Sequence, residues 1–441
     1  MVYRLNEGTN IVVETPFGKT DQVKVGEVVK QGTVLGPQLC CVETDQVNKI
    51  GENQAKALGD QIVAILIFVD DVMKAGTAND VRKAIRNFAE MEKLKKFTYG
   101  LKKTNYMIIR TGREKDEVIA ESVKNGVVQK VFEYKYLGLW VNQDGNLILH
   151  LEKKGGQIKG QVSALKSLAS YYNVGPEFVK LRLTLYELCL VPSILYNLEG
   201  WNKITKAELK KLESIQHKTL CNLLQLPKST AYVGLLNELG MWRMEEKLMY
   251  RKMMLYHNII HSDEDRLCRK IIKDQEKSIE EDTFYHETKQ CFNKIGIDIK
   301  DVDDMLKSQL KNTIKERLNR RMVGVIKNAM RMTKLRFQGV SSTLERKKYI
   351  LNLPGTESLK TMKTRLNMQP VYGNFKCDIT KERLCQHCGE EDDTTEHLVS
   401  CKIFGSHLDP EMLKNEENCE LWKQINQLID FNLNHRLEHP I

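Results

Sequence analysis

A continuous apolar run at residues 62–69 ends in two consecutive aspartates, Asp70 and Asp71, and this junction constrains the fold strongly. The run is rich in β-branched residues and short for a helix, so it predicts a buried strand followed by a turn. Two carboxylates at the tip of an apolar hairpin can share divalent cations. Mg²⁺ suits such a pair because it combines a few carboxylates with phosphate oxygens.

Residues 1–145 around this junction have the pattern of an α+β domain. Strand-like segments occur at residues 10–14, 21–25, 106–109, 127–132 and 136–141, and a helical period occurs between residues 81 and 91. After residue 145, apolar residues recur every three or four positions, which predicts helices. We divide the chain into an α+β region at 1–145, a helical region at 146–260, a basic helical connector at 261–375 and a Cys/His unit at 376–441. The charged stretch at 270–304 is weakly periodic and suggests a flexible connector.

Composition excludes several classes of protein. An apolar content of 41% and a charged content of 29% are typical of a globular chain and not of a disordered one. No apolar run approaches the roughly 18 residues of a membrane span, and the first residues lack the apolar core of a secretory signal. The eleven cysteines are mostly scattered singly, which is typical of a reducing compartment. We therefore expect no membrane partner and an intracellular location, nuclear or cytoplasmic.

Five of the cysteines lie among apolar residues and are expected to be buried: Cys40, Cys189, Cys221, Cys268 and Cys291.

The positive charge is concentrated in one segment. The formal net charge is +10, and residues 311–348 alone hold twelve Lys or Arg against two acids, Glu316 and Glu345. A local basic field of this kind favours a polyanionic partner, most simply nucleic acid. The alternative is an ordinary solvated helix face.

Three further motifs accompany the two aspartates in a fixed order along the chain. They are Gln31-Gly32-x-x-x-Gly36-Pro37 upstream, and Lys103-Thr104 and Tyr136-Leu137-Gly138 downstream. With Phe68-x-Asp70-Asp71, this order resembles the reverse transcriptases of non-LTR (LINE-type) retrotransposons. The likeness continues at Leu195-Tyr196-x-x-Glu199-x-Trp201, which resembles a string found after the thumb of those enzymes and is expected to serve as scaffold.

The resemblance implies a partial polymerase palm at residues 1–145 and a thumb at 146–260. It implies that Asp70 and Asp71 bind Mg²⁺ and that Lys103 acts on the triphosphate, where its charge would stabilise the leaving pyrophosphate. It also implies a site for the template and the incoming nucleotide, and a turn that holds the primer end. The residues of the first are Gln31, Gly32, Gly36, Pro37 and Phe68, and those of the primer grip are Tyr136, Leu137 and Gly138.

The sequence departs from the family pattern at one catalytic ligand. In that family another metal-binding aspartate lies on an earlier palm strand. The first thirty residues here offer only Asp21, which lies just before Gln31 within a predicted hairpin and is in the wrong place. We therefore expect an N-terminally truncated polymerase with little activity of its own, since two-ion phosphoryl transfer depends on that ligand.

A second constellation lies near the end of the sequence, at Cys385-x2-Cys388-x8-His397-x3-Cys401. Two cysteines on a tight loop and a His/Cys pair four residues apart can meet at a tetrahedral centre. Thiolates with an imidazole favour Zn²⁺, which would supply folding energy to a unit with little core. Gly389 suits the turn of the loop, and His387 and His407 are weaker candidate ligands.

The same retrotransposons carry a Cys-Cys-His-Cys unit with a Thr-x-Glu-His-Leu string before its last cysteine. Thr394-x-Glu396-His397-Leu398 resembles that string. The sequence therefore predicts a fragment of a retrotransposon RNA-directed DNA polymerase of the target-primed type, acting on an RNA template and a DNA primer or target. The alternative is a non-enzymatic, zinc-dependent nucleic-acid-binding relic or co-opted protein. An intron-encoded maturase fits the palm motifs but not the Cys/His unit.

Overall fold

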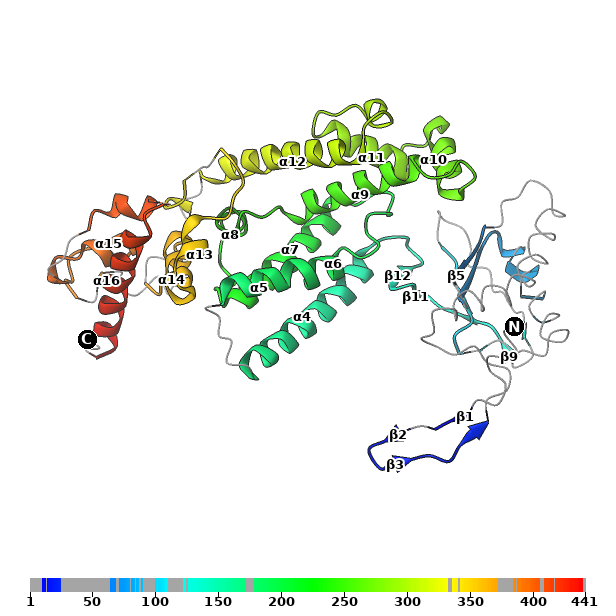
Figure 1. The fold of residues 1–441 in the computed structure, drawn as a ribbon, viewed down its shortest axis with the longest axis horizontal. Coiled ribbons are helices and arrows are strands. Elements are labelled where there is room, and N and C mark those ends of the chain that lie inside the picture. Colours follow the sequence, from blue (N-terminus) through cyan, green and yellow to red (C-terminus); the bar gives the residue numbers. More distant parts are fainter. Residues whose placement is uncertain are drawn as a thin grey trace. The chain divides into compact units, whose positions relative to one another are not determined.

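The chain divides into two compact units in the structure, which is a computed structural model. One unit is Met1–Tyr134 with Asn142–Gly145, and the other is Lys135–Val141 with Asn146–Ile441. The structure describes residues 10–24, 64–89, 100–109, 122–171, 178–331, 335–339, 342–371, 384–404 and 408–438, apart from positions 13, 69, 70, 80, 84, 87, 88, 101, 124, 125, 386 and 416. Strands occur in the first part of the chain and helices dominate the rest, in agreement with the predicted α+β class (Figure 1).

The first unit carries short strands that pair two by two. Among the residues described there, the longest pair is β5 (Ala64–Phe68) with β6 (Asp71–Ala75), which run antiparallel with Phe68 opposite Asp71. The uninterrupted apolar residues of β5 account for its strand structure, as predicted. The other strands are β1 (Asn10–Ile11), β2 (Glu14–Thr15), β3 (Gly18–Lys19), β4 (Val23–Lys24), β7 (Asn105–Tyr106), β8 (Ser122–Val123), β9 (Gly126–Val127) and β10 (Gln129–Lys130). β1–β4, β2–β3 and β8–β9 pair antiparallel, and β7–β10 pair parallel.

The described side chains of this unit form a small core. Ile85, Tyr106 and Val128 are buried, and Val81 and Ile108 pack against them. Fully burying one large apolar side chain contributes about 1.5–3 kcal/mol, so each of these three residues stabilises the described part of the unit.

The strands β11 (Glu133–Tyr136) and β12 (Leu139–Asn142) form a hairpin with a tight loop. Its two loop residues, Leu137 and Gly138, both have positive φ, 45° and 86°. Two positive φ angles in a two-residue loop match the right-handed twist of the flanking strands. A Cβ on Gly138 would also lie 2.8 Å from Cε1 of Tyr196, so this position requires glycine for both its conformation and its space.

Seven helical segments form the body of the second unit. They are α4 (Ile148–Tyr171), α5 (Val179–Leu185), η1 (Tyr186–Leu190), α6 (Val191–Ile194), α7 (Lys206–Leu224), α8 (Tyr232–Leu239) and α9 (Met244–Ile260). Thr205 caps α7 by accepting from the Glu208 N–H at 3.3 Å, and Glu208 Oε2 accepts from the Thr205 N–H at 2.8 Å. The other oxygen of Glu208 accepts from the Leu147 N–H at 2.6 Å, so one carboxylate fixes the starts of both α7 and α4.

A second core lies between α9 and three later segments. These are α10 (Leu267–Lys277), α11 (Phe284–Asn293) and α12 (Lys307–Ala329), with η2 (Ile299–Val302) between α11 and α12. Phe284 and Phe292 of α11 are buried together with Tyr256 of α9 and Ile314 of α12. The structure therefore differs from the flexible connector expected at 270–304, because each helix there presents one apolar face to α9 and leaves its charged face to solvent.

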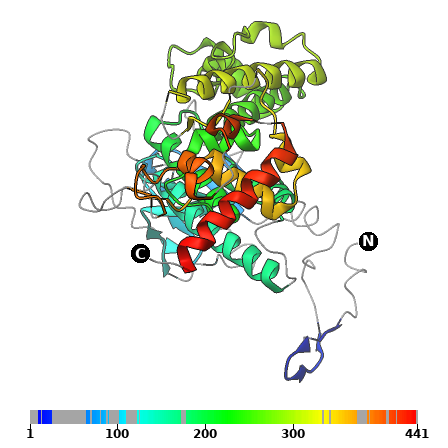
Figure 2. The same cartoon turned by 90° about the vertical axis from the view of Figure 1, so that its left-hand side faces the viewer.

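The end of the chain folds into the main helical core. Its elements are α13 (Lys348–Asn352), α14 (Gly355–Arg365), α15 (Thr395–Ser400), η5 (Lys402–Phe404), η6 (Pro410–Lys414) and α16 (Cys419–Glu438). α16 packs beside α14 and α15, as the two views in Figures 1 and 2 show. Leu398 and Val399 of α15 share one core with Trp422 of α16 and Met362 of α14. The region around the Cys/His cluster therefore has more core than its sequence suggests.

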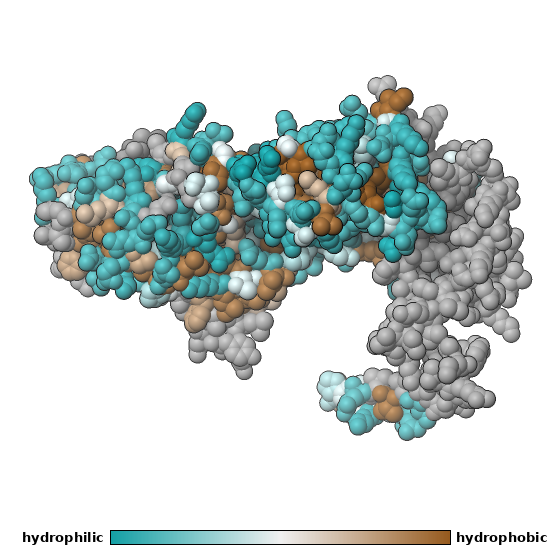
Figure 3. Space-filling model, turned by 45° about the horizontal axis from the view of Figure 1, so that its top comes forward, coloured by the Kyte–Doolittle hydropathy of each residue, from teal (hydrophilic) through white to brown (hydrophobic). Residues whose placement is uncertain are grey.

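Solvent-facing side chains of the helical unit are mainly polar. Figure 3 shows a largely hydrophilic face on the side that carries α12, with scattered apolar side chains. None of the described helices is both long and apolar enough to cross a membrane.

Of the five cysteines that the sequence predicts to be buried, the prediction is confirmed for two. Cys221 and Cys291 are buried, whereas Cys189 and Cys268 are exposed, so the expectation was wrong at these two positions. Cys189 lies in η1, a π-helical turn that shifts the helical period and turns this side chain outward. Cys40 lies outside the described residues.

We predict that Gly240→Ala lowers the free energy of unfolding by about 2–4 kcal/mol. Gly240 ends α8 with φ of 60°, and a Cβ there would lie 2.3 Å from the backbone nitrogen of Arg346. The matched control is Gly160→Ala in α4, where a Cβ meets nothing within 4 Å and should stabilise the helix by about 0.5–1 kcal/mol. Urea denaturation followed by circular dichroism measures both. Equal effects of the two substitutions would contradict the close packing at Gly240.

Candidate metal centre

A closed loop presents the first two cysteines of the cluster. Leu384 and Asp392 form an antiparallel bridge, and the Cys385 N–H donates to the carbonyl of Glu391 at 2.7 Å. Within the loop, the Gly389 N–H donates to the Cys385 carbonyl at 2.9 Å, and Gly389 has φ of 65°. The positive φ favours glycine at this position, as its place in the sequence predicts.

Helix α15 presents the other two side chains. Thr394 caps the start of the helix, and its hydroxyl accepts from the His397 N–H at 3.2 Å. His397 lies in the first turn of the helix, and Cys401 follows its last residue, with the Cys401 N–H donating to the His397 carbonyl at 2.9 Å. The four-residue spacing therefore places both side chains on the side of α15 that faces the loop.

The four predicted ligand atoms converge on one point. One ligand atom each from Cys385, Cys388, His397 and Cys401 lies within 4.8 Å of all the others. Cys388 Sγ and His397 Nε2 are 3.3 Å apart. Tetrahedral zinc with bonds of about 2.3 Å to sulfur requires sulfur atoms about 3.8 Å apart, so the spacing fits such an ion. This cluster could hold a metal ion, and its soft donors favour zinc over a hard cation such as Mg²⁺.

The electrostatics of the cluster also suit a cation. Burial raises the pKa of the Cys388 thiol, but the backbone N–H groups of Glu390 and Glu391, with His397, outweigh it and bring the pKa down to about 7. Burial and the nearby Cys385 sulfur raise the pKa of Cys401 to about 12. Thiolates that lie close together repel each other, which disfavours ionisation of all three cysteines, and a bound cation offsets this repulsion.

Glu391 is part of this site, and the motif spacing did not identify it. Its Oε2 lies 2.9 Å from His397 Nδ1 and accepts a hydrogen bond from the Nδ1–H group. The unprotonated Nε2 is therefore directed at the cluster. A carboxylate in this position fixes the tautomer and orientation of a metal-binding histidine. The only sequence signal is the acidic run at residues 390–393, which does not show which carboxylate reaches the ring.

The weaker candidate ligands do not join the cluster in the part of the chain that the structure describes. His387 lies on the loop but is not among the four converging side chains. His407 lies at a position that the structure does not describe.

The structure describes the residues expected of a polymerase site only in part. Phe68 ends β5 and Asp71 begins β6. Lys103 is exposed in a short turn, in which its N–H donates to the Gly100 carbonyl at 2.8 Å and its carbonyl accepts from the Tyr134 hydroxyl at 3.1 Å. Five predicted residues fall outside the described part of the chain: Gln31, Gly32, Gly36, Pro37 and Asp70.

The predicted primer-grip residues form the tip of one hairpin. Tyr136 is the last residue of β11, and Leu137 and Gly138 form the loop. The Leu137 carbonyl accepts from Asn197 Nδ2 at 3.2 Å, which holds the loop against the segment that follows α6. Leu195 is buried, as expected for a scaffold residue.

We predict that Glu391→Gln weakens zinc binding about 10- to 100-fold, because the neutral amide orients and polarises His397 less well than the carboxylate. Competition with a chromophoric zinc chelator measures the affinity. The matched control is Glu390→Gln, which removes the same charge from the neighbouring exposed residue and keeps its backbone N–H on Cys388 Sγ. Equal affinities for the two variants would show that Glu391 does not support the site.

Comparison with known proteins adds no relative. The sequence matches no protein-family profile and none of the curated proteins.

Proposed function

We propose that this chain is part of an RNA-directed DNA polymerase of the non-LTR retrotransposon type and binds an RNA template with a DNA primer. The observation that supports this most is the convergence of Cys385, Cys388, His397 and Cys401 on one point. The resemblance expects a Cys-Cys-His-Cys unit at this place in the chain, downstream of the palm motifs. Zn²⁺ held there would keep the loop and α15 in position against nucleic acid.

The polymerase part of the proposal rests on the β5–β6 pair. Asp71 begins β6, which pairs antiparallel with the apolar strand β5, and in this proposal Asp70 and Asp71 would be the carboxylates that hold Mg²⁺. Mg²⁺ ions held by carboxylates stabilise the attacking and leaving oxygens of phosphoryl transfer. Lys103 is exposed, which would allow its ammonium group to meet a triphosphate.

The basic segment at 311–348 contributes less charge than its composition suggests. Arg321 pairs with Glu245 at 2.8 Å, Lys348 pairs with Glu417 at 2.9 Å, and Arg336 pairs with Glu396. These acids come from other parts of the helical unit and neutralise part of the excess. The cations that are exposed on α12 and just after it are available to bind a polyanion. They are Lys311, Lys315, Arg317, Lys327 and Arg331.

A second candidate is a non-enzymatic, zinc-dependent nucleic-acid-binding protein. It is favoured by the four-ligand cluster, which is complete without any contribution from the two aspartates. In this version the Cys/His unit and the basic face carry the function, and the two aspartates carry none.

Nucleic-acid binding and polymerisation are separable by two variants. We predict that the purified chain binds an RNA–DNA template–primer duplex and loses about tenfold or more in affinity between 50 and 200 mM salt, because phosphate contacts dominate such binding. Cys388→Ser should abolish stoichiometric zinc and weaken duplex binding, whereas Asp71→Asn should leave binding unchanged. Fluorescence anisotropy measures the binding, and primer extension with Mg²⁺ measures synthesis.

Each outcome has a distinct meaning for the two candidates. Primer extension that Asp71→Asn abolishes supports the polymerase. Binding lost in Cys388→Ser, with no activity affected by Asp71→Asn, supports the non-enzymatic protein. Absence of salt-sensitive duplex binding by the zinc-loaded chain would contradict both.

A further inference from the structure

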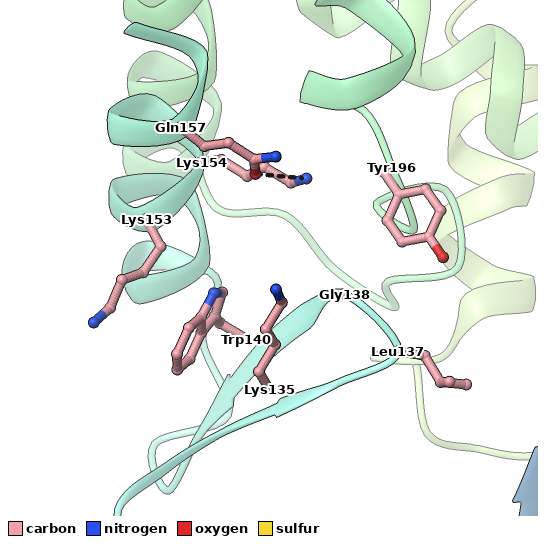
Figure 4. A pocket seen from close by; sticks show the side chains of 8 residues that line it. All are labelled: Lys135, Leu137, Gly138, Trp140, Lys153, Lys154, Gln157 and Tyr196. Carbon is pink, nitrogen blue, oxygen red and sulfur yellow. Dashed lines mark hydrogen bonds between the residues drawn. The ribbon is translucent and has the colours of Figure 1, made fainter. Parts of the chain in front are cut away.

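An open pocket of about 270 Å³ lies where the β11–β12 hairpin meets α4 (Figure 4). None of the side chains that line it is acidic. Lys154 and Gln157 extend into it from α4, Lys135 extends into it from the hairpin, and Tyr196 lines it from the segment after α6. The pocket therefore gathers two amines and an aromatic ring from three separate segments of the helical unit.

Lys154 is buried in this pocket without an acidic partner among the described residues. It is 8% exposed, and its Nζ donates to Gln157 Oε1 over a long 3.4 Å. The same Nζ lies 5.6 Å from the centroid of the Tyr196 ring. The one acid of α4, Glu152, pairs instead with Lys211 of α7. A buried ammonium group without a counter-ion is costly, so this position disfavours the charged form of lysine.

The surroundings of Lys154 favour its neutral amine. Burial is the main cause that lowers the pKa of Lys154, and the charge of Lys135 lowers it further. A lysine that is desolvated or lies next to another cation is an activated nucleophile, because more of it carries a free lone pair. Lys154 therefore combines a reactive amine with an open space through which an electrophile can reach it.

The charge around the pocket distinguishes between the electrophiles that react with amines. An acyl donor would convert Lys154 to a neutral amide, which gives the neighbouring Lys135 no anionic partner. Carbon dioxide is small and apolar, so it suits an amine that is almost buried, and its adduct is a carbamate with a negative charge. That anion would replace the repulsion between the two lysines with an attraction.

The walls of the pocket are held in place before any reaction. The Trp140 N–H donates to His150 Nδ1 at 3.1 Å. Burial, followed by the charge of Lys154, lowers the pKa of His150 to about 4, so its ring is neutral and accepts this hydrogen bond at pH 7. On the opposite wall, Gly138 lets the hairpin loop approach Tyr196. A preformed pocket loses less entropy on forming an adduct than a flexible one.

We propose that Lys154 is a site of reversible carbamylation by carbon dioxide, and that the carbamate pairs with the Lys135 ammonium group. The Nζ lone pair forms a bond to the carbon of CO₂, one C–O π bond opens, and its electron pair becomes the negative charge of the carboxylate. The nitrogen releases one proton to water, so the amine and CO₂ yield a carbamate and one proton without any redox change. The Gln157 side chain accepts from the amine and would turn its amide N–H to the carbamate. This site rests on the pocket alone and is independent of the proposed function.

Carbon-13 NMR of the full chain in labelled bicarbonate is the first test. At a pH of about 8 the α-amino group also reacts with CO₂, and its signal should be equal in every chain. We expect a further carbamate resonance in the wild type that is lost in Lys154→Arg, since a guanidinium keeps the charge and is not deprotonated. The matched control, Lys159→Arg, changes an exposed position of α4 outside the pocket and should keep the resonance. Absence of this resonance from the wild type, or its persistence in Lys154→Arg, would overturn the proposal.

Chemical trapping locates the adduct in the wild-type chain, so it does not depend on the folding of a variant. Triethyloxonium converts a carbamate to a stable ethyl ester, which mass spectrometry of tryptic peptides identifies. We expect the ester on Lys154 and not on Lys159 after equilibration with CO₂. No ester on Lys154, or equal amounts on both lysines, would contradict a selective site.

The role of Lys135 is tested by a second pair of variants. Lys135→Met should lower the carbamate occupancy of Lys154 about three- to tenfold at a given CO₂ pressure, because it removes the counter-ion and lets the amine hold its proton more strongly. Lys153→Met removes the same charge from a lysine whose Nζ lies against the Trp140 ring, 4.8 Å from its centroid, and should have a smaller effect. Equal losses in the two variants would overturn the pairing with Lys135.

Thermal unfolding tests whether the carbamate joins the hairpin to α4. At constant pH and ionic strength, CO₂ should raise the melting temperature of the wild type, because the adduct forms in the folded state and adds an ion pair between the two elements. The melting temperature of Lys154→Arg should not change with CO₂. A rise of equal size in both chains would come from bicarbonate in the solvent and would contradict the proposed ion pair.

Discussion

A buried ion pair between Glu238 of α8 and Arg365 of α14 joins the helical body to the end of the chain. Both side chains are fully buried, and Arg365 Nε lies 3.1 and 3.0 Å from the two carboxylate oxygens. Glu238 also accepts from the Tyr349 hydroxyl at 2.8 Å, and the Arg365 guanidinium donates to the Asn415 carbonyl at 3.3 Å beside the Trp422 ring. Removing one partner of such a pair costs about 3–5 kcal/mol, because the other charge stays buried and unpaired. The elements around the metal ligands depend on this pair for their position.

A short series of contacts leads from this pair to the metal ligands. Two residues after Arg365, the Asn367 side-chain oxygen accepts from the Thr395 hydroxyl at 2.8 Å, and Thr395 begins the helix that carries His397. On its other side α15 packs against α16, where Leu398 and Trp422 share one core. Metal binding and folding of the surrounding helices are therefore expected to be coupled, since a site held by one fold stabilises that fold when occupied.

The features that the sequence predicted are those encoded by local pattern. The apolar run before Asp71 specifies a strand whatever surrounds it, and the spacing of Cys385, Cys388, His397 and Cys401 already restricts them to one loop and one helix turn. The turn at Gly138 was implied by the family resemblance, whereas the local pattern predicted one strand at 136–141; the structure divides that segment into β11, a two-residue loop and β12.

The features that the sequence did not predict depend on contacts between distant segments. Nothing in the sequence of α4 distinguishes Lys154 from Lys153 or Lys159, because its burial arises from the hairpin and Tyr196 packed over it. Glu391 is one of several neighbouring acids, and only the folded loop brings its carboxylate to His397. The charged stretch at 270–304 forms helices because α9 and α12 supply the apolar surface that its own composition lacks.

X-ray absorption spectroscopy of the zinc-loaded chain tests most directly whether these four side chains form one metal centre. The structure predicts an inner shell of three sulfur atoms at about 2.3 Å and one nitrogen at about 2.0 Å. A shell with two nitrogens would show that His387 or another histidine replaces a cysteine. A shell dominated by oxygen would contradict the centre itself, and with it the proposal that zinc holds the loop and α15 in place for nucleic acid.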